Sequence, residues 1–202
     1  MTEFDDVVRR RRMTRAFSDR PVPSGLLDEL LALACRAPSA GKSQGWHFVV
    51  LEGDETSRFW DTTLPPERRS MFAWPGLLRA PVIVLPFADP AAYVERYAEP
   101  DKAGTGLGAG VAAWPVPYWT VDVSMAVMTL LLGAEDRGLG ALFFGVFRGA
   151  EDLVTRLGIP EHVELIGAVA LGYRDEALDV RPGRSATRPR RGLGDVVHRG
   201  GW

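Results

Sequence analysis

The sequence is poor in cysteine and lysine. Cys35 is the only cysteine among 202 residues, which excludes an internal disulfide and a cysteine-based metal cluster and fits a reducing compartment. Lysine occurs only as Lys42 and Lys102, so almost every positive charge is an arginine. Arginine is therefore the main source of positive charge for a bound anion.

Long apolar runs and a recognisable leader are also missing. The N-terminal stretch MTEFDDVVRRRR carries charges where a signal peptide would be apolar. The longest apolar run, VSMAVMTLLLGA, has about half the length that a membrane span requires. With 46% hydrophobic and 25% charged residues, the composition is typical of a globular protein with a sizeable core. We therefore expect a cytoplasmic protein without a membrane partner.

The arginines gather at the two ends of the chain. They are Arg9, Arg10, Arg11, Arg12 and Arg15 near the start, and Arg181, Arg184, Arg188, Arg190, Arg191 and Arg199 near the finish. Three interpretations are open: a nucleic-acid surface, an ordinary solvated surface, or a few arginines from both ends around one phosphate. The planar, bidentate guanidinium group suits the third interpretation.

Hydrophobic periodicity predicts a mixed fold. We expect helices over 2–12, 24–36 with Ser24 as the N-cap, 117–138 and 150–158, and one or two more within 54–80. We expect strands over 46–52, 81–88, 139–145 and 162–173. The glycine- and proline-rich stretch 98–117 is predicted to be a long loop, and the tail from Asp179 has no periodicity. This order of elements favours an α+β or three-layer α/β fold.

Sequence patterns for side-chain catalysis are absent. His47, His162 and His198 have no metal-ligand spacing, and no G-x-S-x-G pattern occurs. Gly41-Lys42-Ser43 is only half of a phosphate-binding loop, and it follows a predicted helix rather than a strand. GTGLGA, starting at Gly104, lacks the preceding strand of a dinucleotide fold. An enzyme with this sequence would depend on a cofactor for its chemistry.

Three segments together resemble the FMN-dependent nitroreductase family. The first, RRRMTRAF from Arg10 to Phe17, is similar to the opening R-R-S-x-R-x-F of that family. The resemblance implies that Arg11, Met13 and Arg15 hold the FMN phosphate and ribityl chain. Met13 replaces the serine of the family and lacks its hydroxyl. Arg12 could contact the phosphate or lie on the surface.

The second segment, APSAGKSQGWHFVV over residues 37–50, resembles A-P-S-x-x-N-x-Q-P-W-x-F. Lys42 replaces the usual asparagine, and Gly45 replaces the proline. We expect a positive charge at Lys42 to stabilise a reduced, anionic flavin and so to raise its reduction potential. The residues that the resemblance places against the cofactor in this segment are Pro38, Ser39, Ala40, Lys42 and Gln44.

The third segment runs from GLGALFFG, starting at Gly138, through RLGIPEHVELIGAVALGY to RPRRGLGDVVHR. In the family the main chain at positions equivalent to Gly145 and Val146 approaches flavin N5. Arg188 and Arg190 fall where the family has phosphate-binding basic residues. The three segments occur in the family's order and cover nearly the whole chain.

The resemblance implies one nitroreductase-like domain over 1–202, with a three-layer α/β/α arrangement around a mainly antiparallel sheet. It also implies a lid at about 98–119, an extended C-terminal arm at about 179–202, and an intertwined homodimer with FMN at the interface. In the lid, we expect Trp114, Tyr118 and Trp119 to face a flat substrate.

The activity implied by the resemblance is electron transfer from NAD(P)H through FMN to an electron-poor acceptor such as a nitroaromatic or a quinone. No catalytic side chain, metal or nucleic acid is required. Two alternatives remain open: a flavin-storage or sequestration protein with little turnover, and a specialised flavoenzyme of the same fold.

Overall fold

A computed structural model describes residues 3–179 and 187–202. Within them, five strands form one sheet in the order β1-β2-β5-β3, and the short β4 pairs with β2. Every pairing between these strands is antiparallel. The strands are β1 (Trp46–Glu52), β2 (Val82–Ala88), β3 (Gly140–Phe144), β4 (Glu164–Leu165) and β5 (Ala168–Gly172). The predicted α+β class with an antiparallel sheet is confirmed.

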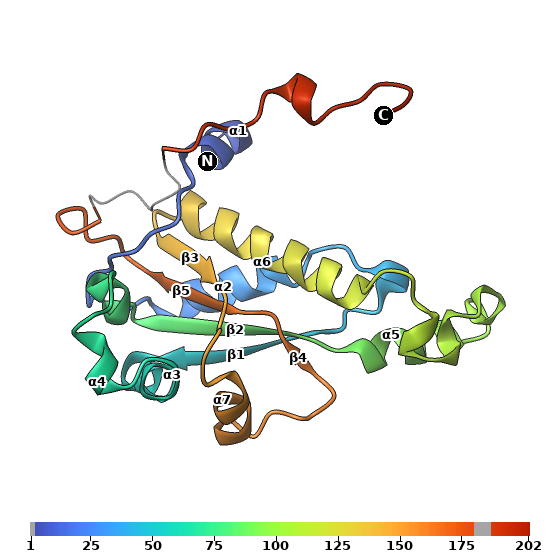
Figure 1. The fold of residues 1–202 in the computed structure, drawn as a ribbon, viewed down its shortest axis with the longest axis horizontal. Helices are drawn as coiled ribbons and strands as arrows, with labels where there is room; N and C mark the ends of the chain where they lie inside the picture. Colours follow the sequence, from blue (N-terminus) through green and yellow to red (C-terminus); the bar gives the residue numbers. More distant parts are fainter. Residues whose placement is uncertain (1–2, 180–186) are drawn as a thin grey trace.

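Helices cover both faces of the sheet (Figure 1). The α-helices are α1 (Phe4–Arg10), α2 (Ser24–Ala34), α3 (Thr56–Thr63), α4 (Pro66–Arg69), α5 (Pro90–Ala98), α6 (Tyr118–Asp136) and α7 (Ala150–Arg156). Helices α2 and α6 pack together on one face, while α3 and α7 cover the other. The sheet is therefore the middle of three layers.

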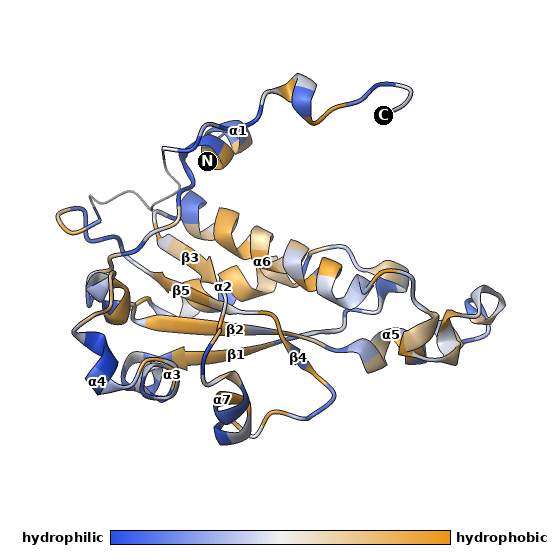
Figure 2. Cartoon of the chain, viewed as in Figure 1, coloured by the Kyte–Doolittle hydropathy of each residue, from blue (hydrophilic) through white to orange (hydrophobic). Residues whose placement is uncertain are grey.

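Strand β2 is buried along its whole length, and its alternating side chains divide the interior into two cores. Val82 and Val84 face α2 and α6. Ile83 and Leu85 face α3 and α7. A strand covered on both faces is apolar at every position, which explains the continuous run that predicted it. In Figure 2 the sheet and the α6 face toward it are predominantly hydrophobic.

Helix α6 is the longest helix of the described chain, with 19 residues. Val123, Val127 and Leu130 recur at helical spacing and are buried. Val121 and Met128, on another side of the helix, are 40% and 41% exposed. The helix ends just before Gly138, whose φ of 72° suits glycine. One side of α6 thus belongs to the core, and another remains uncovered in the single chain.

Some predicted boundaries were wrong. Pro23 is the N-cap of α2 and Ser24 its first residue, and no side chain caps the helix. The predicted strand over 162–173 is two strands, separated at Ile166 and Gly167. The predicted loop 98–117 contains three short 3₁₀ turns packed beside α5. In the described residues, no helix has the length and apolarity to cross a membrane.

Candidate functional site

The N-terminal arginine segment is attached to one end of the sheet. Met13 forms a parallel bridge with Ala141 in β3, and Thr14 N donates to Ala141 O at 3.0 Å. Phe17 bridges Arg174, just beyond the end of β5. Backbone pairing therefore holds this segment in an extended conformation, so that residues 11–15 have defined positions.

Arg11 has an unpaired guanidinium nitrogen. Its Nη1 is buried and hydrogen-bonds to no described residue. A buried donor on a charged group costs free energy unless an acceptor meets it. A phosphate oxygen from a ligand would satisfy this donor, and arginine is well suited to phosphate. The role of Arg11 as an anion ligand stays a prediction, which this buried donor supports.

Arg12 and Arg15 are engaged within the chain. Arg12 Nη1 lies 2.9 Å from Asp179 Oδ2, and Arg15 N donates to Asp179 Oδ1 at 2.9 Å. Arg15 Nη1 donates to the Met13 carbonyl at 3.1 Å, and its guanidinium lies 5.2 Å from the ring centre of Trp74. Arg12 is thus half-exposed and paired with Asp179, and its contact with a phosphate stays a prediction. Arg15 and Trp74 border a cavity of about 360 Å³.

A buried charge network contacts the N-terminal arginine segment at Thr14. Glu135 on α6 is 7% exposed and pairs with Arg174. Arg174 Nε also donates to Thr14 Oγ1 at 3.1 Å. Glu135 and Arg174 were not among the residues predicted for the site. The sequence feature that indicates a buried pair is the glutamate in the apolar stripe of a helix predicted to be buried, since glutamate is seldom buried without a partner.

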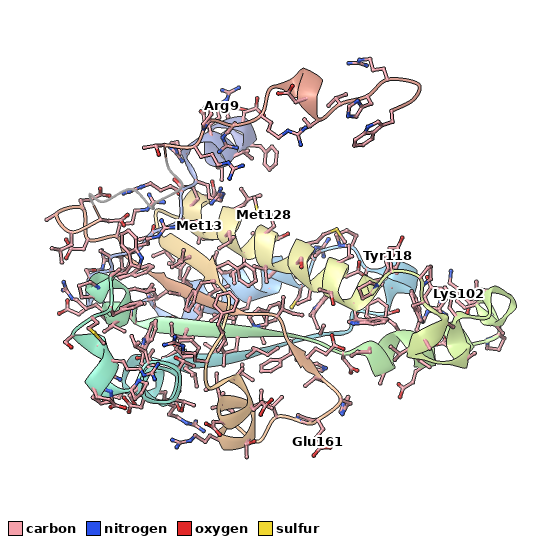
Figure 3. All side chains as sticks on the ribbon, viewed as in Figure 1. Arg9, Met13, Lys102, Tyr118, Met128 and Glu161 are labelled. Atoms are coloured by element: carbon pink, nitrogen blue, oxygen red, sulfur yellow. The ribbon has the colours of Figure 1, made fainter. Side chains whose placement is uncertain are left out.

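The loop 38–45 lies at the other end of the sheet. It leads into Trp46, which pairs with Ala88 at the end of β2, whereas the Arg11 segment lies near Val82. These two positions on β2 are separated by roughly 20 Å at the usual rise per residue. In Figure 3, Met13 and Tyr118 lie near opposite ends of α6. One chain does not bring the two expected cofactor segments together.

Within this loop the predicted residues differ in exposure. Pro38, Lys42 and Gln44 are exposed, and Ser39 Oγ accepts from Gln44 N at 3.0 Å. The N–H of Ala40 donates to the buried carboxylate of Asp122 at 2.7 Å. The expected contact of Ala40 with the cofactor stays a prediction.

Gly145 and Val146 follow β3 and border an aromatic cavity of about 360 Å³. Trp60 and Phe144 both line this cavity and stack on each other, with ring centres 6.1 Å apart and planes at 5°. Phe147 lies at the cavity rim and is 94% exposed. The predicted main-chain position is thus next to an apolar space that could take a flat ring.

The expectation that two lid tryptophans face a substrate is wrong for this chain. Trp114 and Trp119 are 8% and 5% exposed and form a core cluster with Tyr93. Trp114 Nε1 donates to Leu107 O at 3.1 Å, and Trp119 Nε1 to Glu164 at 3.2 Å. Tyr118 is 41% exposed and remains available. The aromatic side chains stabilise the 98–117 stretch instead of lining a surface.

The described part of the C-terminal arm, residues 187–202, is exposed along its length. It extends past α1, away from the sheet (Figure 1). Arg188 and Arg190 form no ion pair with a described residue. Arg181 and Arg184 lie outside the described residues.

No group of three or more His, Cys, Asp or Glu side chains in the described ranges is arranged to hold a metal ion.

Tyr93 has a strongly perturbed ionisation. Burial and its hydrogen bond to Asp122 raise the pKa of Tyr93 far above its usual range.

Comparison with known proteins matches residues 8–173 to the Nitroreductase family. The chain is 30% identical over 213 residues to 4-nitrobenzoate reductase of Nocardioides sp. strain LMS-CY, covering 92% of this chain and 86% of that protein. It is 31% identical over 181 residues to NADH dehydrogenase of Thermus thermophilus, covering 83% and 84%.

Solved structures have the same fold. Nitroreductase CinD from Lactococcus lactis, in complex with chloramphenicol, superposes with a TM-score of 0.73 at 18% identity, covering 97% of this chain and 98% of that one. A protein from Desulfovibrio desulfuricans, assigned to the nitroreductases and solved with FMN, gives 0.68 at 22% identity, covering 98% and 96%.

Proposed function

The chain belongs to the nitroreductase family, and from this we propose that it is an FMN-dependent enzyme that passes electrons from NAD(P)H to an electron-poor aromatic or quinone. The observation that carries the FMN part of the proposal is the buried Nη1 of Arg11, which has no hydrogen-bond partner among the described residues. A relative is named for reduction of 4-nitrobenzoate, and a protein of the same fold was solved with FMN. Each description applies to the protein that carries it, and both support the proposal for this chain.

The residues at the Arg11 end fit the phosphate and ribityl part of FMN. Arg11 supplies a cationic donor that meets no partner within residues 3–179 and 187–202. Arg15 borders the adjacent cavity and is held by Met13 O and Asp179. Met13 lacks a hydroxyl, so its contribution would come from the main chain. Because these groups are already fixed by the sheet and by Asp179, little ordering would be needed on binding.

We further propose that the second cofactor segment comes from a second copy of the chain. Loop 38–45 lies at the far end of the sheet from Arg11, but it exposes Lys42 and Gln44. The uncovered side of α6, with Val121 and Met128, and the neighbouring Leu33 on α2 offer an apolar surface for that copy. A two-fold dimer through this surface would combine unlike segments at two equivalent sites. The exposed arm with Arg188 and Arg190 would reach the partner.

When bound, FMN would supply the capacity to accept a hydride at N5 and to return electrons to an acceptor. The chain's own contribution is binding and orientation. The main chain at Gly145 and Val146 would border the reactive edge, and Lys42 from the partner would place a positive charge near the ring. The aromatic cavity beside Gly145 would receive the flat acceptor and exclude water. Tyr118 would contribute an exposed ring at the other end of the same interface.

The visible spectrum of the purified protein tests this proposal. We expect a yellow protein, or one that becomes yellow with added FMN and is reduced rapidly by NADH or NADPH in stopped-flow measurements. A colourless protein that FMN does not reconstitute would contradict it. Binding of FMN with slow or absent reduction would instead favour sequestration. Affinity for DNA that falls steeply with salt would indicate a nucleic-acid surface.

A further inference from the structure

The loop Ser39–Gly45 has an unfavourable backbone conformation at two positions. Lys42 and Gln44 have φ angles of 59° and 53°, in the left-handed region that residues with side chains rarely adopt. They are the only non-glycine residues with positive φ in the described chain. Such strain persists only where surrounding contacts hold it, and it is concentrated at functional sites.

A buried carboxylate on α6 holds this loop. Asp122 is 2% exposed, and its Oδ2 accepts from Ala40 N–H at 2.7 Å and from Tyr93 O–H at 2.7 Å. Tyr93 extends from α5, so one oxygen atom connects α5, α6 and the loop. Because Tyr93 keeps its proton at ordinary pH, this donor is always available.

The carboxylate of Asp122 forms no ion pair with any of the residues that the structure describes. Burial of an unpaired carboxylate is costly, and an apolar side chain of similar size would fill the same space at lower cost. The function of Asp122 must therefore lie in its two hydrogen bonds. One of them fixes the peptide at the start of the strained loop.

The approach of Tyr93 depends on Gly45. A Cβ atom at position 45 would lie 2.6 Å from Tyr93 Cε2 and 2.8 Å from the Asp89 carbonyl oxygen. Any larger residue here would displace the Tyr93 ring from its present position. Gly45, Tyr93 and Asp122 thus act as one unit, in which the missing side chain of Gly45 makes room for the second donor to Asp122.

We propose that Asp122 and Tyr93 are positioning residues that hold the Ser39–Gly45 loop in its strained conformation, so that Lys42 and Gln44 are presented to the cofactor site of a second copy. Arg96 supports the same conformation from the other side, since its Nε donates to Gly41 O at 2.9 Å. The consequence for FMN rests on the proposed function, whereas the hold on the loop does not.

Amide hydrogen exchange at Ala40 and the FMN dissociation constant together test the proposal. In Asp122→Ala we expect exchange at Ala40 to accelerate and FMN binding to weaken, each by roughly tenfold or more. Asp122→Asn should behave nearly as wild type, because both hydrogen bonds end on one oxygen and an amide oxygen can accept both. Tyr93→Phe keeps the Ala40 bond and should give a smaller effect.

Val127→Ala is the matched control. Val127 is buried on the same helix as Asp122, in the core between α2, α6 and the sheet. This variant should lower the melting temperature without accelerating exchange at Ala40 relative to other loop amides. Unchanged exchange at Ala40 in a folded Asp122→Ala variant would overturn the proposal, as would failure of Asp122→Asn to restore it. If wild-type protein binds no FMN, the proposed function fails, and the exchange experiment still decides whether Asp122 holds the loop.

Discussion

Arg12 and Asp179 form an ion pair at 2.9 Å between residues 167 positions apart in the sequence. The carboxylate of Asp179 is 3% exposed, and its other oxygen accepts from Arg15 N at 2.9 Å. This pair fastens the start of the C-terminal arm to the N-terminal arginine segment. Two neighbouring arginines thus differ: Arg12 is paired within the chain, whereas the Nη1 of Arg11 has no partner in the part of the chain that the structure describes.

Replacing Arg12 should reduce stability. Arg12→Ala leaves the buried Asp179 carboxylate without its cation, and we expect a loss of about 1–3 kcal/mol in the free energy of unfolding. Urea denaturation followed by circular dichroism measures this. Arg9→Ala is the control, since Arg9 is exposed and its ion pairs with described residues are to Asp5 and Asp6 on its own helix. Equal stability of the two variants would contradict the role assigned to Arg12.

Replacing Arg11 should affect cofactor binding and leave stability nearly unchanged. A charge-assisted hydrogen bond to phosphate contributes about 1.5–3 kcal/mol, so Arg11→Ala should weaken FMN binding by roughly 10- to 100-fold. Quenching of FMN fluorescence gives the dissociation constant, and riboflavin, which lacks the phosphate, serves as the control ligand. A similar loss for riboflavin and FMN would show that Arg11 does not bind the phosphate.

Lys42→Asn should lower the reduction potential of bound FMN, because it removes a positive charge that favours the reduced, anionic flavin. Asparagine tolerates the φ of 59° at this position better than lysine, so the fold should not suffer. Lys102→Asn, at the only other lysine, is the matched control. The midpoint potential from dye-coupled titration decides the matter, and an unchanged value would exclude Lys42 from the site.

Trp114 and Tyr118 should respond in opposite ways. Trp114→Ala removes a ring from the core and should cost about 3–5 kcal/mol of stability. Tyr118→Ala, at a side chain 41% exposed, should leave stability within about 0.5 kcal/mol and raise KM for an aromatic acceptor. Thermal denaturation and steady-state kinetics on both variants test this contrast. If Trp114→Ala is stable and has an altered KM, Trp114 contacts the substrate and is not needed for the core.

Stability should fall in alkali because of Tyr93. The folded state keeps its phenol protonated, since the pKa of Tyr93 is raised far above the ordinary value, whereas the unfolded chain releases this proton above about pH 10. The contribution of Tyr93 to the free energy of unfolding is therefore fully present below pH 10. Above that pH it falls by about 1.4 kcal/mol per pH unit. Tyr93→Phe should lack this part of the decline. Parallel pH profiles of unfolding for the two proteins would refute the assignment.

Local sequence patterns predicted much of the fold. The continuous apolar run of β2 and the helical repeat of α6 are properties of neighbouring residues, and both elements are present. The family resemblance, carried by three short segments, is confirmed by the family match over residues 8–173. Boundaries were less predictable, as at Ser24, because a helix end depends on which backbone groups find partners.

By itself the sequence determined most of the helices and strands through their periodicity, and three short motifs predicted the family, whose resemblance implied the antiparallel sheet. Both kinds of pattern depend on neighbouring residues. Only the tertiary structure decided how particular side chains are used. It paired Arg12 with Asp179, engaged the Ala40 amide with Asp122, and buried Trp114 and Trp119. Each outcome depends on contacts between residues distant in sequence, whose free energies of burial and hydrogen bonding no local pattern records.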